Sequence, residues 1–118
     1  MGQEKAEETV KHILTDDRLS ALKSLLEKDH AIDCIFLLHL KKGRWKDAKD
    51  FIRSKLERTI SDGTFRARMM ELEDQGLAES VPIDPLKKYY VKTTFGGRVA
   101  ELLLELFDKA EEDIKRVQ

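Results

Sequence analysis

Apolar residues recur at helical spacing along most of the chain, which predicts a mainly α-helical protein. The pattern is short and weak around Val10 and Leu14, and it becomes stronger over 19–26, where four leucines share one face. Residues 31–40 are apolar almost all round, which is typical of a buried central helix. An amphipathic pattern over 45–56 predicts a further helix.

The best-specified helix starts at Ser61 or Asp62, because either side chain can accept hydrogen bonds from first-turn amides. Gly76 suits the left-handed position after the last turn, and Leu77 is expected to fold back in a Schellman end. Its expected core stripe is Phe65, Met69 and Leu72. The face predicted to point outward carries Gly63, Ala67, Met70 and Asp74, with Arg66 on the flank.

Two short antiparallel strands are predicted next, over 78–82 and 88–92, joined by a turn over 83–87. Pro82 and Pro85 are placed at the turn, because proline has no N–H to donate to a ladder. The strands therefore form a small two-stranded ribbon.

A long last helix follows the ribbon, capped by Thr93 or Thr94 and running to about Val117. Its apolar stripe is broad, and the helix is longer than it needs to be to cover a small core. The segment 43–45, far upstream, is a candidate for a short third strand beside the ribbon.

Composition limits the classes of protein that this chain can be. With 118 residues, 41% hydrophobic and 38% charged, it is the size of one domain with a real core. No apolar run approaches the roughly 20 residues that span a bilayer, and the polar N-terminus does not resemble a signal peptide. A single cysteine cannot form an internal disulfide framework, so the cytoplasm is the expected compartment.

Charge is distributed unevenly, although the net charge is only −1. Residues 41–70 hold ten Lys/Arg against four Asp/Glu, a balance of +6. Residues 1–30 hold five against seven, and residues 71–118 hold seven against eleven. The basic middle segment is the part of the chain that favours a polyanionic partner.

Catalytic and metal-binding chemistry find little support. Cys34 lies in a strongly apolar helix, where a cysteine is usually packing, although a redox switch is the alternative. The three histidines are scattered, and none has a helical neighbour at i+3 or i+4 that would make a metal site; Asp16 near His12 is an ordinary surface pair. No metal and no cofactor are predicted. Without a nucleophile–base pattern or a phosphate-binding glycine loop, the chain is not expected to be an enzyme.

Two motifs resemble those of winged helix-turn-helix regulators of bacteria and archaea, especially the MarR, HxlR and PadR groups. The segment Arg68–Leu77, RMMELEDQGL, is similar to the R-L-x-x-L-E-x-x-G-L that ends their recognition helices. Tyr90–Gly96, YVKTTFG, is similar to their Y-x-L-T-x-x-G junction between wing and last helix. Lys92 stands where an apolar residue is usual, so either the register differs by one and Val91 points inside, or the ribbon is less buried.

The resemblance covers about residues 31–107 and implies a mainly α fold with a small antiparallel β-ribbon. The expected architecture is a winged helix-turn-helix with extra N-terminal helices and a long C-terminal helix. We expect a single domain over 1–118. Its parts are an N-terminal helical extension (1–30), a winged helix-turn-helix core (31–92) and a C-terminal helix (93–118) for dimerisation.

The same resemblance implies a sequence-specific DNA-binding transcriptional regulator that acts as a homodimer. The recognition helix, about 62–75, would enter the major groove of double-stranded DNA, and the wing, about 78–92, would contact the flanking backbone. Arg66 is the expected base reader, because a guanidinium pairs with guanine O6 and N7 together. The expected DNA contacts are Thr64, Arg66, Ala67, Arg68, Met70, Lys46, Lys87 and Lys88, with further phosphate contacts from Lys49, Lys55 and Arg58. Arg68 lies nearer the core, where Glu71 is an alternative partner.

The expected dimer interface is formed by the last helix, through Leu102, Leu103, Leu106, Phe107, Ala110 and Ile114. The alternative is that this helix folds back on the N-terminal helices of its own chain. Any small-molecule effector would have to bind at the dimer interface, because no separate sensor domain is predicted.

Two other functions remain open at this point. A winged domain can serve as a protein–protein interaction module or as a subunit of a larger assembly. A non-specific chromatin-type protein would bind DNA with strong salt dependence and little sequence preference.

Overall fold

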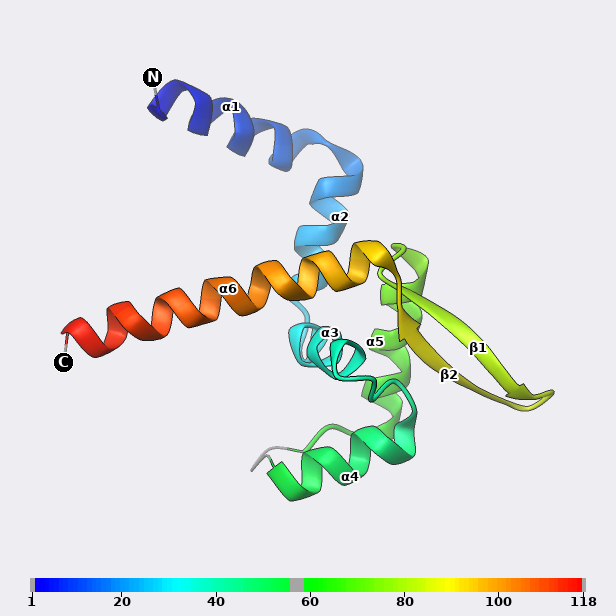
Figure 1. Cartoon of the computed structure of the whole chain (residues 1–118). Helices are drawn as coiled ribbons and strands as arrows, with labels where there is room; N and C mark the ends of the chain where they lie inside the picture. The colour runs from blue at the N-terminus through cyan, green and yellow to red at the C-terminus, as the bar shows by residue number, and fades with distance from the viewer. Residues whose placement is uncertain (1, 56–58, 118) are drawn as a thin grey trace.

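Six helices and one β-ribbon form the described part of the chain, with five helices first, then the two strands and the last helix (Figure 1). The computed structural model describes residues 2–55 and 59–117; Leu56 and Arg58 of the sequence predictions lie outside them. The elements are α1 (Gly2–Thr15), α2 (Asp17–Leu26), α3 (Ala31–His39), α4 (Trp45–Lys55), α5 (Asp62–Asp74), β1 (Ala78–Asp84), β2 (Lys87–Lys92) and α6 (Thr94–Val117). The mainly α-helical fold class is confirmed.

The two N-terminal helices meet at a sharp bend at Asp16, which is the N-cap of α2. One carboxylate oxygen of Asp16 accepts hydrogen bonds from the amides of Arg18 and Leu19, each 3.0 Å long. Helix α1 has no buried residue and projects from the body of the molecule (Figure 1). None of the helices in the described ranges is long and apolar enough to cross a membrane.

Helix α3 is the centre of the core, as its nearly continuous apolar sequence predicts. Five of its nine residues are buried: Ala31, Cys34, Ile35, Leu37 and Leu38. The buried cluster around them includes Leu25 of α2, Ile52 of α4, Met69 of α5 and Ala100 of α6. Every helix except α1 therefore contributes to one continuous core.

Helix α5 begins and ends at the residues that the sequence predicts. The hydroxyl of Ser61 accepts from the amide of Thr64 at 3.1 Å, so Ser61 is the cap and Asp62 begins the helix. At the other end Gly76 has φ +83°, and its amide donates to the carbonyl of Glu73. The Leu77 amide donates to the Leu72 carbonyl at 2.8 Å, which completes the predicted Schellman end.

The ribbon is longer than predicted, and the position of Pro82 in the turn is wrong. Pro82 lies within β1, opposite Lys88, and the turn is narrowed to Pro85 and Leu86. A two-stranded ribbon has two open edges, so a residue without an N–H is tolerated there. The predicted third strand is reduced to one hydrogen bond, from the Tyr90 amide to the Gly43 carbonyl at 3.1 Å; the sheet found in the described residues has two strands.

Lys92 lies on the same face of the ribbon as Tyr90, so the register does not differ by one. Lys92 pairs with Ala78 and Tyr90 with Ser80, and Tyr90 is buried. Lys92 is half-buried, and its Nζ forms a hydrogen bond with Nδ1 of His39 at 3.0 Å. The second alternative is correct: the ribbon is less buried at Lys92 than it is where an apolar residue stands at this position.

Helix α6 starts against the end of α5. Thr93 is its cap, because the Thr93 hydroxyl accepts from the Gly96 amide at 2.9 Å. The same hydroxyl donates to the Gly76 carbonyl at 2.6 Å. Gly96 then passes so close to Leu77, which directly precedes β1, that a Cβ there would lie 1.9 Å from the Leu77 carbonyl oxygen.

We expect Gly96→Ala to destabilise the fold by about 1–3 kcal/mol, because the new methyl group would push α6 away from the Leu77 backbone. Gly97→Ala is the matched control: its Cβ meets only the flexible end of Lys92, at 3.5 Å. Urea unfolding of both variants measures the difference. Equal stabilities would contradict the close packing of α6 on Leu77.

Candidate nucleic-acid interface

The outward face of α5 carries small side chains in its first half and an acidic residue only at its end. Met70 and Asp74 are exposed, Gly63 is exposed and Ala67 is half-buried. The opposite face, with Phe65, Met69 and Leu72, is buried as predicted. Small side chains on the open face leave room for a close approach by another molecule.

Arg66 lies on the flank of α5 and reaches into solvent, with its side chain 69% exposed. Its Nε donates to the carboxylate of Asp62 at 2.8 Å, one helical turn earlier. Within the part of the chain that the structure describes, its two terminal nitrogens have no hydrogen-bond partner. The two donors needed for bidentate pairing are therefore available.

Arg68 does not lie on the open face; its side chain is only 17% exposed and serves the fold. Its Nε donates to the Asp29 carbonyl at 2.7 Å, and a terminal nitrogen donates to the Glu71 carboxylate at 2.8 Å. The predicted alternative partner, Glu71, is the one found. A guanidinium held by two internal acceptors is poorly placed to contact DNA, so Arg68 is left out of the interface.

Two of the three acidic residues near the end of α5 are also engaged internally. Glu71 accepts from Arg68 and from Lys28, which donates at 2.9 Å. Glu73 accepts from the Ser80 amide at 2.9 Å and so ties α5 to β1. Asp74 is the one that faces outward.

The tie between α5 and β1 sets the position of the ribbon relative to Arg66. At 100° per residue, Glu73 and Arg66 lie on the same flank of α5. Hydrogen bonds from Ser80 hold the pKa of Glu73 below its ordinary value, and the positive charge of Lys88 acts in the same direction. The base of the ribbon, at Ser80, therefore lies on the flank of α5 that also carries Arg66.

The end of the ribbon carries exposed lysines on a well-defined turn. The Asp84 carboxylate accepts from the amides of Leu86 and Lys87, both at 2.8 Å, which fixes the turn. Lys87 and Lys88 are exposed, and Lys88 Nζ lies 5.4 Å from the centre of the Tyr90 ring. The sequence predicts no function for Leu86, because a residue between proline and lysine in a turn is an ordinary loop residue. In the structure this leucine is 95% exposed.

The remaining predicted DNA contacts among the described residues lie on α4 and in the first turn of α5. Thr64 is half-buried and accepts from the Ser61 hydroxyl at 2.9 Å, so it helps to form the helix cap. Trp45 packs on Phe65 with ring centres 5.1 Å apart, which brings the start of α4 next to α5. Lys46 follows Trp45 directly and is exposed, as is Lys55 at the end of α4, whereas Lys49 is half-buried.

The residues predicted for dimerisation divide into two groups on α6. Leu103 packs partly on the core, Ala110 is half-buried, and Phe107 meets Phe36 of α3 edge to face, with ring centres 6.2 Å apart. Leu102, Leu106 and Ile114 are exposed. Leu103 and Phe107 therefore serve the fold of their own chain, and Phe107 does so against α3.

Cys34 is fully buried in α3, and burial raises the pKa of its thiol to about 12. A thiol with this pKa is almost entirely protonated at neutral pH and is a poor nucleophile. Among the described residues no three His, Cys, Asp or Glu side chains come together as a metal site requires.

We expect Cys34 to resist the thiol reagent DTNB at pH 8 for as long as the protein stays folded, because its pKa is about 12 and the side chain is buried. In 6 M guanidinium chloride, roughly the concentration that unfolds even very stable domains, one thiol per chain should react at once. Absorbance at both conditions measures this. Rapid reaction of the native protein would support the redox-switch alternative.

Comparison with known proteins supports the fold. No family profile matches the sequence, and the search of curated proteins finds no relative. Among solved structures, the crystal structure of a MepR point mutant from a multidrug-resistant S. aureus clinical isolate is similar, with a TM-score of 0.54 and 16% identity. The match covers 98% of this chain and 83% of that one. The likeness shows that this chain has a winged helix-turn-helix fold.

Proposed function

We propose that this protein is a sequence-specific DNA-binding transcriptional regulator that acts as a homodimer. The observation that carries the proposal is the Glu73–Ser80 hydrogen bond, which attaches the ribbon to the flank of α5 that carries Arg66. Arg66 on the helix and Lys87 and Lys88 on the ribbon lie on one side of the molecule, as inferred from the Glu73–Ser80 tie. The likeness to MepR, a winged-helix regulator, supports the same function.

In this proposal the first half of α5 enters the major groove. Gly63 and Ala67 allow a close approach, and Arg66 reads guanine with its two terminal nitrogens. Asp74 keeps the other end of the helix out of the groove, because its exposed carboxylate would repel phosphate. Few side chains then reach base edges, so part of the specificity depends on DNA shape.

Phosphate contacts from the surrounding lysines position the helix. Lys46 lies near the start of α5, and Lys87 and Lys88 extend along the ribbon. Such contacts supply affinity without reading sequence, and they make binding salt-dependent. The proposed site of action is the cytoplasm, and no effector is assigned.

The variant Arg66→Ala/Lys87→Ala/Lys88→Ala tests this interface. We expect its affinity for mixed-sequence duplex DNA to fall at least about a hundredfold, and the salt slope to decrease by about 2–3 per protomer. Fluorescence anisotropy across a salt series measures both quantities.

The matched control removes three cations from the end of α6 instead: Lys109→Ala/Lys115→Ala/Arg116→Ala. All three pair with carboxylates of their own helix. The control should bind DNA as the wild type does. Absence of wild-type binding at low salt, or equal losses in both triple variants, would contradict the proposed interface.

The homodimer is proposed from the surface that one chain leaves uncovered. The accessible surface is 8980 Å², whereas a compact monomer of 13.7 kDa exposes about 6,600 Å². The radius of gyration is 16.4 Å, against about 13.5 Å for a compact chain of this length. An excess of this order is similar in size to a homodimer interface.

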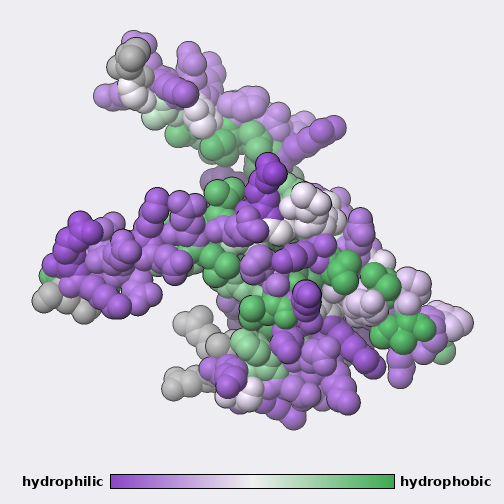
Figure 2. All heavy atoms as spheres, in the orientation of Figure 1, coloured by the Kyte–Doolittle hydropathy of each residue, from purple (hydrophilic) through white to green (hydrophobic). Residues whose placement is uncertain are grey.

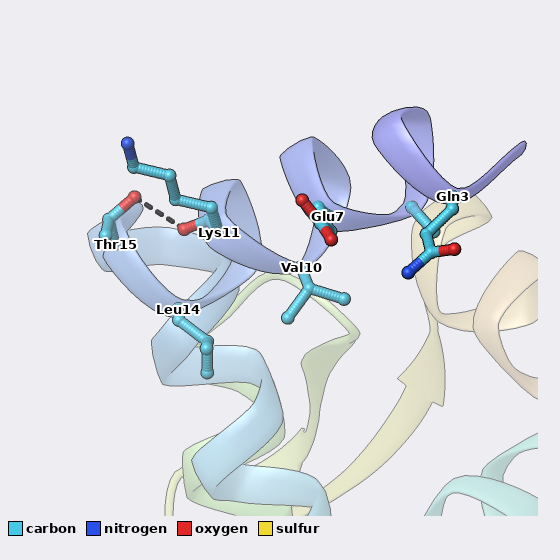
Figure 3. A pocket seen from close by; sticks show the side chains of 7 residues that line it. Gln3, Glu7, Val10, Lys11, Leu14 and Thr15 are labelled. Carbon is cyan, nitrogen blue, oxygen red and sulfur yellow. Dashed lines mark hydrogen bonds between the residues drawn. The ribbon is translucent and has the colours of Figure 1, made fainter. Parts of the chain in front are cut away.

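The uncovered surface lies largely on α1 and α6, which extend from the body in the same direction (Figure 1). Helix α6 is about 36 Å long, and its buried residues, Gly96 and Ala100, lie near its start. Val10 and Leu14 point to the same side of α1 (Figure 3). Hydrophobic residues cover the lower side of α1 in the view of Figure 2. We propose that both helices pack on a second copy.

We expect Leu106→Glu/Ile114→Glu to be a monomer, because two buried carboxylates would be costly in an apolar interface. Sedimentation equilibrium should give twice 13.7 kDa for the wild type and 13.7 kDa for the variant. Leu86→Glu, on the ribbon, is the control and should stay dimeric. A monomeric wild type at micromolar concentration would contradict the proposed homodimer.

A second candidate function, a protein–protein interaction module, is favoured by the outer face of the ribbon. Val81, Tyr89 and Val91 are only half-buried there, and Ile83 is exposed. Ile83, Tyr89 and Val91 line a groove of about 670 Å³ together with Leu38 and Arg44. Under this reading the Arg66 triple variant would leave partner binding intact.

A further inference from the structure

We propose that Leu86 is an apolar wedge that enters the minor groove and bends the duplex. The inference rests on the proposed DNA-binding function and goes beyond it, because it adds DNA bending as an activity. Its physical basis is the placement of one leucine, one carboxylate and two lysines at the end of the ribbon.

Leu86 is the most exposed large hydrophobic residue of the described chain, at 95%. Single exposed leucines are common, so exposure alone decides nothing. This leucine, however, stands on a constrained support. Pro85 before it has a fixed φ, and the Asp84 carboxylate binds the amides of Leu86 and Lys87. The side chain is therefore presented from a defined turn.

The charges around the tip suit the groove rather than an apolar protein surface. Lys87 and Lys88 follow Leu86 directly and are exposed, so two cations stand just behind the apolar end. The one carboxylate of the tip, Asp84, is turned back onto the backbone amides. An apolar point backed by cations is complementary to a groove whose floor is base edges and whose walls are phosphates.

The shape of the ribbon also suits this role. The seven residues of β1 span about 23 Å, so the tip stands well away from the core. Figure 1 shows the ribbon as an arm that projects from the body beside α5. The minor groove is about 6 Å wide, which admits one side chain but no helix. Leucine is among the residues that proteins insert between base steps, where they kink the duplex by roughly 20–90°.

Bending can be measured separately from binding. The full-length protein is titrated onto two end-labelled duplexes of about 30 base pairs, one with central TA steps, which kink easily, and one with a stiff A-tract. Energy transfer between the ends reports the bend at saturation. The wild type should raise energy transfer on the TA duplex more than on the A-tract duplex.

Leu86→Ala should lose most of this increase while its affinity falls only about threefold to tenfold, because the phosphate and major-groove contacts remain. Leu86→Met keeps a long apolar side chain and should retain the bend. Val117→Ala, at a position that is 87% exposed on α6, is the control for removing an exposed aliphatic group.

Equal energy transfer by the wild type and Leu86→Ala at saturation would overturn the wedge and leave the proposed DNA-binding function standing. Failure of the wild type to bind either duplex at low salt would overturn both. Loss of the bend in Leu86→Met as well as in Leu86→Ala would also overturn the wedge, because only backbone effects would then explain it.

Discussion

The backbone of Gly76 and Leu77 joins the parts of the molecule that face outward. The Leu77 amide closes the end of α5 on Leu72, and the Leu77 carbonyl accepts from the Thr93 amide at 3.1 Å. The Gly76 carbonyl accepts the Thr93 hydroxyl, and Gly96 packs against the Leu77 carbonyl. Two adjacent peptide groups thus fix the end of α5, the base of the ribbon and the start of α6. The relative positions of α5, the ribbon and α6 all depend on them.

The polar contacts of α5 divide its charged residues between two tasks. Arg68 and Glu71 face the turn between α2 and α3, where Lys28 and the Asp29 carbonyl complete the network. Charge-assisted hydrogen bonds of this kind hold a helix at one rotation about its axis. Arg66 is left to solvent by the same rotation. The orientation of the outward face is therefore set by contacts on the opposite flank.

Local signals predicted much of this structure, because caps, turns and apolar stripes depend on neighbours within a few residues. Ser61, Gly76 and the buried stripe of α5 are such cases. Errors arose where distant residues decide the outcome. The place of Pro82 depends on which edge of the ribbon is open. Lys92 is tolerated because its Nζ forms a hydrogen bond with Nδ1 of His39, 53 residues away. The partner of Arg68 was predicted only in part, since Asp29 is remote in sequence.

The absence of buried residues in α1 has a consequence for how the molecule opens. Unfolding of this 14-residue helix exposes no core, so it does not require the rest of the chain to unfold. An isolated helix of this length is marginal in water. Its amides should therefore exchange hydrogen quickly in a solitary chain and slowly only where something covers Val10 and Leu14. Hydrogen exchange in α1 thus reports on assembly, because the free energy of its local unfolding is separate from that of the core.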